Sequence, residues 1–409
     1  MKRDRFRLAH LVSHPVPYFA PLYREIASRP EIDLTVYFYS DETLGEFYHP
    51  SVGRTLRWDT PMLGGYEHRL LPSASRTRVA SARTRRPNVD IVREVASSGY
   101  DAIWVHGYDH PTTWLAVAAA RAKGIPVLVR DEQTLLDQRR GSKRVIRDVA
   151  LRAFLSNVTG LYIGEQNRRF LRRYGVPESR MFAARYCVDN EFFARRADEL
   201  VPRRRELRVG FGITNDAPVV LFTGRMVEKK RPLLLLEAFA RVRKQLECSL
   251  LVAGDGPLRA AAESFIAQHS LADVHFAGFL NQQELPDAYG AADVFTLPSA
   301  HHETWGLVVN EAMNFGLPVV ATDAVGCAED LVHPCRNGFT VPHDDRGALA
   351  DALSVLVDDA SLRARFGAAS REIVAAYNVE RCADGIVDAC MSVARGVRAA
   401  TSREYRDAA

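Results

Sequence analysis

Residues 299–322 read SAHHETWGLVVNEAMNFGLPVVAT and contain three local patterns in a fixed order. A polar loop comes first, and residues 306–315 then carry apolar side chains close to helical spacing. Gly316 and Pro318 end this helix, and residues 319–321 follow as a short apolar strand. A loop, a helix and a buried strand are half of a repeating α/β unit, in which ligands bind near the start of the helix.

Two glutamates accompany this expected helix: Glu303 lies just before it and Glu311 lies inside it. The free N–H groups of the first turn, near Gly306 and Leu307, form an anion site, and Gly306 has no Cβ to keep a phosphate away. Carboxylates beside an anion are expected to accept hydrogen bonds from neutral hydroxyls, so the pattern describes a nucleotide-sugar site. The alternative is that Glu303 caps the helix and Glu311 is a solvated surface residue.

Composition favours a folded protein of two or three domains. The chain has 409 residues, of which 47% are hydrophobic and 25% charged. The 6 cysteines show no CxxC pair or metal-ligand spacing, which is typical of reduced thiols in a cytoplasm. Because no apolar run reaches about 18 residues and no secretory N-terminus is visible, we expect a cytoplasmic protein without a membrane span.

Charge is divided unevenly along the chain. Residues 1–200 hold 32 Lys and Arg against 23 Asp and Glu, a net of +9, and residues 201–409 hold 22 against 27, a net of −5. A basic first half suggests contact with an anionic membrane surface or a phosphorylated acceptor, and the alternative is a solvated arginine-rich face.

Strands and helices alternate along both halves, which favours two doubly wound α/β domains facing each other across a cleft. In the first half strands are expected at residues 6–12, 32–39, 102–105 and 127–129, with residues 41–89 irregular. A second run starts with a strand at residues 219–222, after an arginine-rich connection. The expected domains are residues 1–195, residues 205–376, and C-terminal helices at residues 377–409 that pack back toward the first domain.

Several blocks of the second half share one resemblance. They are Phe222-Thr223-Gly224-Arg225, Lys230-Arg231-Pro232, Ala253-Gly254-Asp255-Gly256-Pro257, Phe276-Ala277-Gly278-Phe279, Pro298-Ser299, Glu303-Thr304-Trp305-Gly306-Leu307 and Asn310-Glu311-Ala312. In this order they resemble family 4 of the retaining, two-Rossmann-domain (GT-B) glycosyltransferases, also called glycosyl transferases group 1. The resemblance covers about residues 205–345 closely.

The resemblance implies a role for each matching residue. Arg225 and Lys230 would neutralise the donor diphosphate, Glu311 would bind the ribose and Glu303 the hexose, so that Glu303, Arg225 and Lys230 are the expected catalytic residues. The alternative for Arg225 and Lys230 is an exposed basic turn. The expected donor-binding residues are Gly224, Arg225, Lys230, Phe279, Glu303, Gly306, Leu307 and Glu311.

The first half departs from the family pattern. Pro15 and Pro17 replace the glycine pair that many members have after the first strand, and Arg130-Asp131-Glu132 stands where many have a histidine. On the acceptor side we expect Glu132, with His106 and His110, to orient the acceptor, and the alternative for each is a structural role.

The expected activity is retaining transfer of a hexose from a UDP- or GDP-sugar to a hydroxyl of a glycan, glycolipid or small-molecule acceptor. No Asp-x-Asp motif is present, so no metal or other cofactor is expected, and nothing points to nucleic acid. The basic, partly apolar segment at residues 135–154 predicts a peripheral position on the inner face of a membrane. The alternatives are a GT-B sugar-nucleotide epimerase and an inactive glycosyltransferase-like scaffold.

Overall fold

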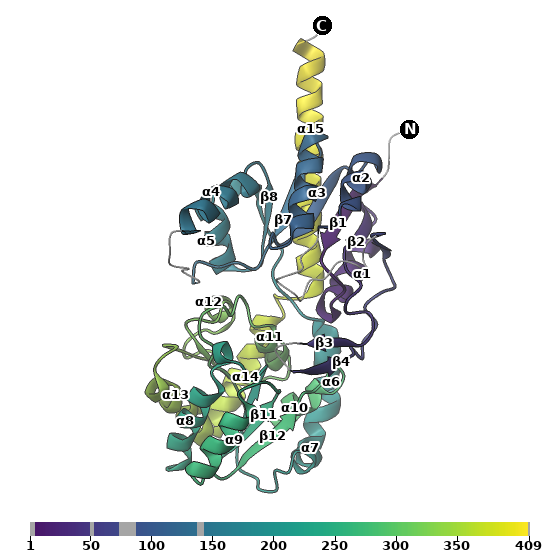
Figure 1. Cartoon of the computed structure of the whole chain (residues 1–409). Helices are drawn as coiled ribbons and strands as arrows, with labels where there is room; N and C mark the ends of the chain where they lie inside the picture. Colours follow the sequence, from purple (N-terminus) through teal and green to yellow (C-terminus); the bar gives the residue numbers. More distant parts are fainter. Residues whose placement is uncertain (1–4, 50–52, 73–86, 137–142, 408–409) are drawn as a thin grey trace. The chain divides into compact units, whose positions relative to one another are not determined.

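The structure, a computed structural model, describes residues 5–49, 53–72, 87–136 and 143–407. The chain divides into two compact units (Figure 1). Unit 1 comprises Met1–Phe47, Pro61–Arg185 and Val379–Ala409, and unit 2 comprises Tyr48–Thr60 and Tyr186–Asn378.

Unit 1 is built on a parallel sheet whose strands follow the order β5-β2-β1-β6-β7-β8-β9 in the described residues. Apart from the polar edge strand β5, the strands are short and mostly apolar, as expected for a parallel sheet with both faces covered. The strands are β1 (Phe6–Val12), β2 (Ile32–Phe38), β5 (Glu67–Leu70), β6 (Ala102–His106), β7 (Val127–Arg130), β8 (Thr159–Tyr162) and β9 (Met181–Ala183).

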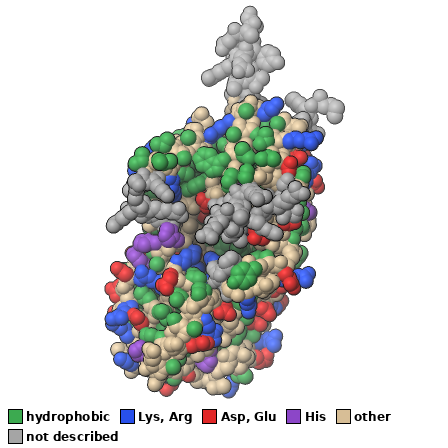
Figure 2. Space-filling model, in the orientation of Figure 1, with side chains coloured by type: hydrophobic (Ala, Val, Ile, Leu, Met, Phe, Trp, Pro, Cys, Tyr) green, Lys and Arg blue, Asp and Glu red, His purple; other side chains and the backbone are tan. Residues whose placement is uncertain are grey.

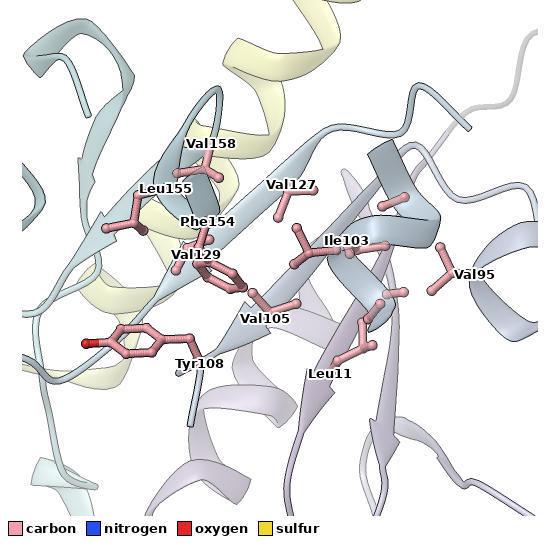
Figure 3. Packing of buried hydrophobic residues seen from close by; sticks show 14 of the residues in the cluster. Leu11, Val95, Ile103, Val105, Tyr108, Val127, Val129, Phe154, Leu155 and Val158 are labelled. Atoms are coloured by element: carbon pink, nitrogen blue, oxygen red, sulfur yellow. The ribbon is translucent and has the colours of Figure 1, made fainter. Parts of the chain in front are cut away.

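Alternate residues of these strands point to opposite faces of the sheet, and each face has its own helices. One face packs against α2 (Asp90–Ser97), α3 (Pro111–Ala122), α4 (Lys143–Leu155) and α5 (Glu165–Arg173). Figure 3 shows part of this core, where Val105 and Val129 of the strands meet Phe154 of α4. The other face contacts α1 (Ala20–Ser28) and α15 (Val379–Asp407).

Unit 2 is built on a second parallel sheet, with the order β12-β11-β10-β13-β14-β15 in the described residues. Its strands are nearly all apolar and fully buried at the centre. They are β10 (Val219–Thr223), β11 (Ser249–Ala253), β12 (Val274–Gly278), β13 (Val294–Leu297), β14 (Val319–Thr322) and β15 (Gly338–Val341).

Two groups of helices pack around the second sheet. The first group is α8 (Pro232–Arg243), α9 (Arg259–Gln268) and α13 (Arg346–Asp358). The second is α6 (Asn190–Leu200), α7 (Arg204–Gly210), α10 (Leu285–Ala291), α11 (Leu307–Asn314) and α14 (Ala360–Val374), with α12 (Ala328–Leu331) contacting α14. The prediction of two doubly wound α/β domains is confirmed in this alternation of parallel strands and helices.

Three sequence expectations differ from the structure. Residues 41–89 are not wholly irregular, because β5 pairs with β2 and a small two-stranded sheet joins β3 (Phe47–His49) to β4 (Arg54–Leu56). The side chains of β5 are polar and mostly exposed, so the sequence shows no alternation of apolar and polar residues that would predict this strand. The arginine-rich connection is helical. Because its helix α6 packs on α10 and α11 within unit 2, the domain boundary expected near residue 195 falls inside this unit.

Residues 346–374 form two helices, α13 and α14, and not one long helix. Asp359 separates α13 from α14 in an extended conformation, and its side chain accepts a hydrogen bond from the Leu362 N–H at the start of α14. An aspartate in that position satisfies a first-turn donor and starts a new helix. None of the described helices combines the length and the apolar composition needed to cross a bilayer.

Candidate active site

The loop after β10 carries Gly224, Arg225 and Lys230, and it is held by close backbone contact with a second loop. A Cβ on Gly254 would collide with the carbonyl oxygen of Gly224, so the two loops approach at a distance that only glycine allows. The Met226 N–H donates to the Asp255 carbonyl at 2.9 Å and fixes their register. The glycines of both motifs therefore position the start of the basic loop.

Lys230 and Glu303 form a buried ion pair. Lys230 Nζ lies 2.5 Å from Glu303 Oε2, and the two side chains are only 10% and 9% exposed. The Ser299 hydroxyl donates to the same carboxylate at 3.0 Å. The structure thus brings together two residues that are 73 positions apart and that the sequence nominated for the same site.

The charges around Glu303 favour its ionised form. Burial alone would raise the pKa of this carboxyl, but the nearby charges of Lys230 and Lys229 and the hydrogen bonds from Lys230 and Ser299 lower the pKa below its ordinary value. A buried carboxylate that stays ionised is a strong acceptor for hydroxyl groups.

Helix α11 has Gly306 at its N-cap position, before its first residue, Leu307. Gly306 has a φ of 98°, in the left-handed region, and no side chain caps the helix. A Cβ at this position would lie 2.8 Å from Leu297 Cδ2, so the turn requires glycine. The alternative that Glu303 caps the helix is therefore wrong, and the first-turn N–H groups of α11, from Leu307 onward, are those of an uncapped helix of eight residues.

Glu311 lies inside α11 and is 4% exposed, so the alternative that it is a solvated surface residue is also wrong. The Tyr289 hydroxyl of α10 donates to Glu311 Oε2 at 2.6 Å, and it lies 3.3 Å from the Thr223 hydroxyl. Burial raises the pKa of Glu311 to about 7, although the hydrogen bond from Tyr289 opposes the rise. Near neutral pH this carboxyl group is divided between its two protonation states.

Arg225 and Phe279 complete the predicted donor set. Arg225 is half-buried in the same loop as Lys230. Phe279 follows β12, and the guanidinium carbon of Arg54 lies 4.8 Å from the centre of its ring. Arg54 belongs to β4, which explains why residues 48–60 pack with unit 2.

The predicted acceptor-side residues lie in unit 1, where two of them meet. His106 ends β6, and its Nε2 lies 3.3 Å from Glu132 Oε1, just beyond β7. His110 instead caps helix α3, since its Nδ1 accepts a hydrogen bond from the Thr112 N–H at 3.2 Å. His110 therefore has the structural role that the sequence analysis gave as its alternative, as the cap of α3.

Residues 203–373, which lie within unit 2, match the family model of the glycosyl transferases group 1. Unit 2 is a group 1 glycosyl transferase domain. The resemblance seen in the sequence motifs is confirmed by this match.

Relatives with assigned names are glycosyltransferases. An alpha-D-kanosaminyltransferase of Streptomyces kanamyceticus is 31% identical over 216 residues, 52% of this chain and 54% of the relative. A GDP-mannose-dependent alpha-mannosyltransferase of Mycobacterium tuberculosis is 36% identical over 203 residues, 49% of this chain and 47% of the relative. The chain spans about half the length of the relatives that it matches.

Solved glycosyltransferase structures share the fold of the whole chain. A glycosyltransferase from Rickettsia africae superposes with a TM-score of 0.72 at 14% identity and covers 96% of this chain and 99% of its own. Anabaena Alr3699/HepE in complex with UDP and glucose gives a TM-score of 0.69 at 18% identity, with 95% and 100% covered. The predicted GT-B fold is confirmed by this likeness.

The sequence assigned no role to three residues around these sites, although two of them, Ser299 and Asp131, lie in motifs named above. Tyr289 and Ser299 hold the two glutamates of the group 1 domain, and a hydroxyl on the apolar helix α10 was the available signal for Tyr289. In unit 1 the buried Asp131 accepts hydrogen bonds from the Asn167 side chain at 2.8 Å and the Gln133 N–H at 2.9 Å. Burial raises the pKa of Asp131 to about 7.

Among the described residues, no group of three or more His, Cys, Asp or Glu side chains is arranged to hold a metal ion. Lys230, Ser299 and Glu303 lie together at the loop before α11, and Glu311 lies about one turn inside the helix. The site offers cations, backbone N–H groups and carboxylates to a ligand.

Proposed function

We propose that the protein is a retaining glycosyltransferase that moves a hexose from a UDP- or GDP-sugar to a hydroxyl of a glycan, glycolipid or small-molecule acceptor. The observation that carries the proposal is the buried Lys230–Glu303 pair before α11, with Glu311 buried about one turn into the helix. The family match supports it, as do relatives named for GDP-mannose and a fold neighbour bound to UDP.

In this proposal the donor diphosphate lies between the basic loop and the start of α11. Arg225 and Lys230 neutralise its charge, and the first-turn N–H groups near Gly306 and Leu307 bind the distal phosphate or the sugar. Glu303 accepts hydrogen bonds from the hexose, and Glu311 accepts them from the ribose. Two fixed cations then supply the stabilisation that a metal ion would otherwise provide.

The same arrangement accounts for retention. Departure of the nucleoside diphosphate builds negative charge on the phosphate oxygen, and the cations and helix N–H groups stabilise that charge. An acceptor hydroxyl then attacks from the side that the leaving group has vacated, and the departing phosphate oxygen takes its proton. No separate protein base is required, which suits a chain that lacks the loop histidine of the family pattern.

We further propose that the protein is cytoplasmic and binds the inner face of an anionic membrane through α4. Val145, Ile146 and Val149 are 69%, 74% and 63% exposed on this helix. Figure 2 shows hydrophobic side chains exposed on the unit that carries α4. Of the basic residues expected to contribute, Arg139 and Arg140 lie outside the described residues, as do the side chains of Lys143 and Arg144.

A thermal-shift screen across UDP-, GDP- and ADP-sugars tests the donor. A ligand at 100 times its dissociation constant stabilises the folded state by about 2.7 kcal/mol, so one nucleotide series should raise the Tm clearly above the others. The Arg225→Ala variant is the control, and its Tm should respond to the same donor only at concentrations about ten- to a hundredfold higher. A wild-type protein that responds to none of these donors would contradict the proposal.

Incubation with the identified donor alone separates the alternatives. A transferase releases the sugar slowly by transfer to water, an epimerase converts the sugar while it stays attached to the nucleotide, and an inactive scaffold does neither. The proposal predicts slow release of free sugar without epimerised donor.

A further inference from the structure

A polar cavity lies in unit 2, at the opposite end of α11 from Gly306. Its volume is about 400 Å³, and it is bordered by the start of α7, the residues after α11 and one face of α14. Among the described residues that line it, the charged ones are Arg204, Arg363, Arg371 and Asp293. None of these belongs to the predicted donor set.

Each of the three arginines is held in place by backbone carbonyl groups. Arg363 Nη1 donates to the Leu356 and Val357 carbonyls at 2.8 and 2.7 Å, and Arg371 donates to the Asn314 and Phe315 carbonyls at 3.5 and 3.2 Å. These bonds cap the C-terminal ends of α13 and α11.

Arg204 is fixed in the same way from α7. It donates to the Gly290 carbonyl and to Asp293 Oδ1, both at 3.1 Å. A guanidinium group has five N–H donors, and each of these three arginines gives two hydrogen bonds to the described protein atoms. Each guanidinium group is therefore oriented by the protein and keeps N–H donors for a ligand.

The carboxylate in the cavity does not balance these charges. Asp293 already pairs with Arg208 at 2.5 Å as well as with Arg204 at 3.1 Å. Neither Arg363 nor Arg371 forms an ion pair with an acidic side chain among the described residues. Burial lowers the pKa of Arg204 and the charge of Asp293 opposes the fall, while repulsion from Arg208, Arg363 and Arg371 adds to the effect of burial.

Helix capping explains each arginine separately, but it does not require three of them to border one cavity. One carboxylate does not offset the charge of three arginines, so the cations repel one another, and an anion in the cavity would reduce that repulsion. Guanidinium groups match the oxygens of phosphate in a bidentate geometry. A cavity of about 400 Å³ has room for a diphosphate or a phosphorylated sugar.

We propose that this arginine cavity binds a small anion of the phosphate class, at a site separate from the donor site. Arg204, Arg363 and Arg371 provide the N–H donors, while Ala364 and Ala368 of α14 form part of the wall without contributing charge. Because α11 runs between the two sites, an anion here would contact the arginine that caps the helix carrying Glu311.

Isothermal titration of the full chain with inorganic pyrophosphate tests this site, and inorganic phosphate in parallel tests whether one phosphoryl group suffices. Pyrophosphate is expected to bind the Arg225→Ala variant, in which the proposed donor diphosphate contacts are weakened. Ala364→Glu places a carboxylate on the cavity wall without removing a helix cap, and it should weaken this binding at least about tenfold. Ala364→Gln has the same shape without the charge and should weaken it less.

Arg371→Gln provides an independent variant that removes a cation and should also weaken pyrophosphate binding about tenfold. Circular dichroism and the Tm of each variant establish that the folded state is retained. The proposal is overturned if the wild-type chain does not bind pyrophosphate. It is equally overturned if Arg225→Ala abolishes binding while Ala364→Glu and Arg371→Gln leave it unchanged.

Discussion

Lys230 Nζ lies 2.5 Å from Glu303 Oε2 in a buried ion pair. In the proposed mechanism the two residues serve different parts of the donor, the lysine its diphosphate and the glutamate its hexose. Within the pair each charge neutralises the other. Donor binding must therefore bring a second anion to Lys230 while Glu303 accepts sugar hydroxyls, and the pair sets the charge of the site before the substrate arrives.

Removal of one member of the pair should destabilise the protein as well as inactivate it. Lys230→Met leaves the Glu303 charge buried without its partner, which typically costs about 3–5 kcal/mol of stability. Replacement of both residues, as in Lys230→Met with Glu303→Gln, should restore most of that stability because no buried charge is left unpaired. Denaturant unfolding of both single variants and the double variant measures the coupling.

Activity should not recover with stability in the double variant. Transfer by Lys230→Met/Glu303→Gln is expected to stay about ten- to a hundredfold or more below wild type, since the charge-assisted contacts to the donor are gone. Wild-type turnover by the double variant would show that the pair is only structural.

Donor binding should strengthen as the pH rises through about 7, the pKa of Glu311. Burial raises this pKa from its ordinary 4.5, so the folded state holds a proton that the unfolded state has lost between these two values. The contribution of Glu311 to stability is therefore full below pH 4.5 and is lost as the pH approaches 7. Only the ionised carboxylate is a full acceptor for the ribose hydroxyls, so the donor Kd should fall over the same range and level off above it.

Two variants test whether Glu311 is the group that causes this pH dependence. Glu311→Gln should bind the donor with a Kd that no longer changes between pH 6 and pH 8. Tyr289→Phe removes the hydrogen bond that lowers the pKa of Glu311, so its pH step should move to higher pH. A step that persists in Glu311→Gln would assign the titration to another group.

Much of the fold was predictable because its signals are local. The apolar strands β10 and β13 and the stop of α11 at Gly316 can be recognised in short windows of sequence. Edge strand β5 was missed because its exposed side chains carry no alternating pattern, and the division between α13 and α14 depends on the cap made by Asp359. Such features depend on tertiary contacts or on one side chain.

The candidate site was also predictable only in part. Family motifs named Arg225, Lys230 and both glutamates, because motif order survives in the sequence. The hydrogen-bond partners of those glutamates could not be predicted from the motifs, because Tyr289 reaches Glu311 from a different helix, 22 residues away in the sequence. The arginine cavity was equally hidden, because its cations come from two helices that only the folded chain brings together.

Activity should survive removal of divalent metal ions. Arg225 and Lys230 are proposed to stabilise the leaving diphosphate, so transfer by protein treated with EDTA should equal that of untreated protein. Added Mg²⁺ serves as the matched control and should leave the rate unchanged within about twofold. A strict requirement for added Mg²⁺ or Mn²⁺ would refute metal-independent catalysis.

Binding to anionic vesicles should depend on the exposed apolar residues of α4. Val149→Asp places a carboxylate at a position that is 63% exposed, and it should reduce cosedimentation with phosphatidylserine vesicles at low salt. Val209→Asp, at a position 58% exposed on α7 of unit 2, is the matched control and should bind as the wild type does. Equal binding by both variants, or no binding by the wild type, would exclude α4 as the membrane contact.

The most direct test of the proposed reaction is the anomeric configuration of the glycoside that the enzyme forms. With an α-linked donor and an acceptor that carries a hydroxyl group, proton NMR of the product gives this configuration, which a glycosidic bond preserves. A mechanism in which the acceptor enters on the leaving group's own side predicts an α-linked product. A β-linked product would contradict retention, and with it the roles proposed for Arg225, Lys230 and Glu303.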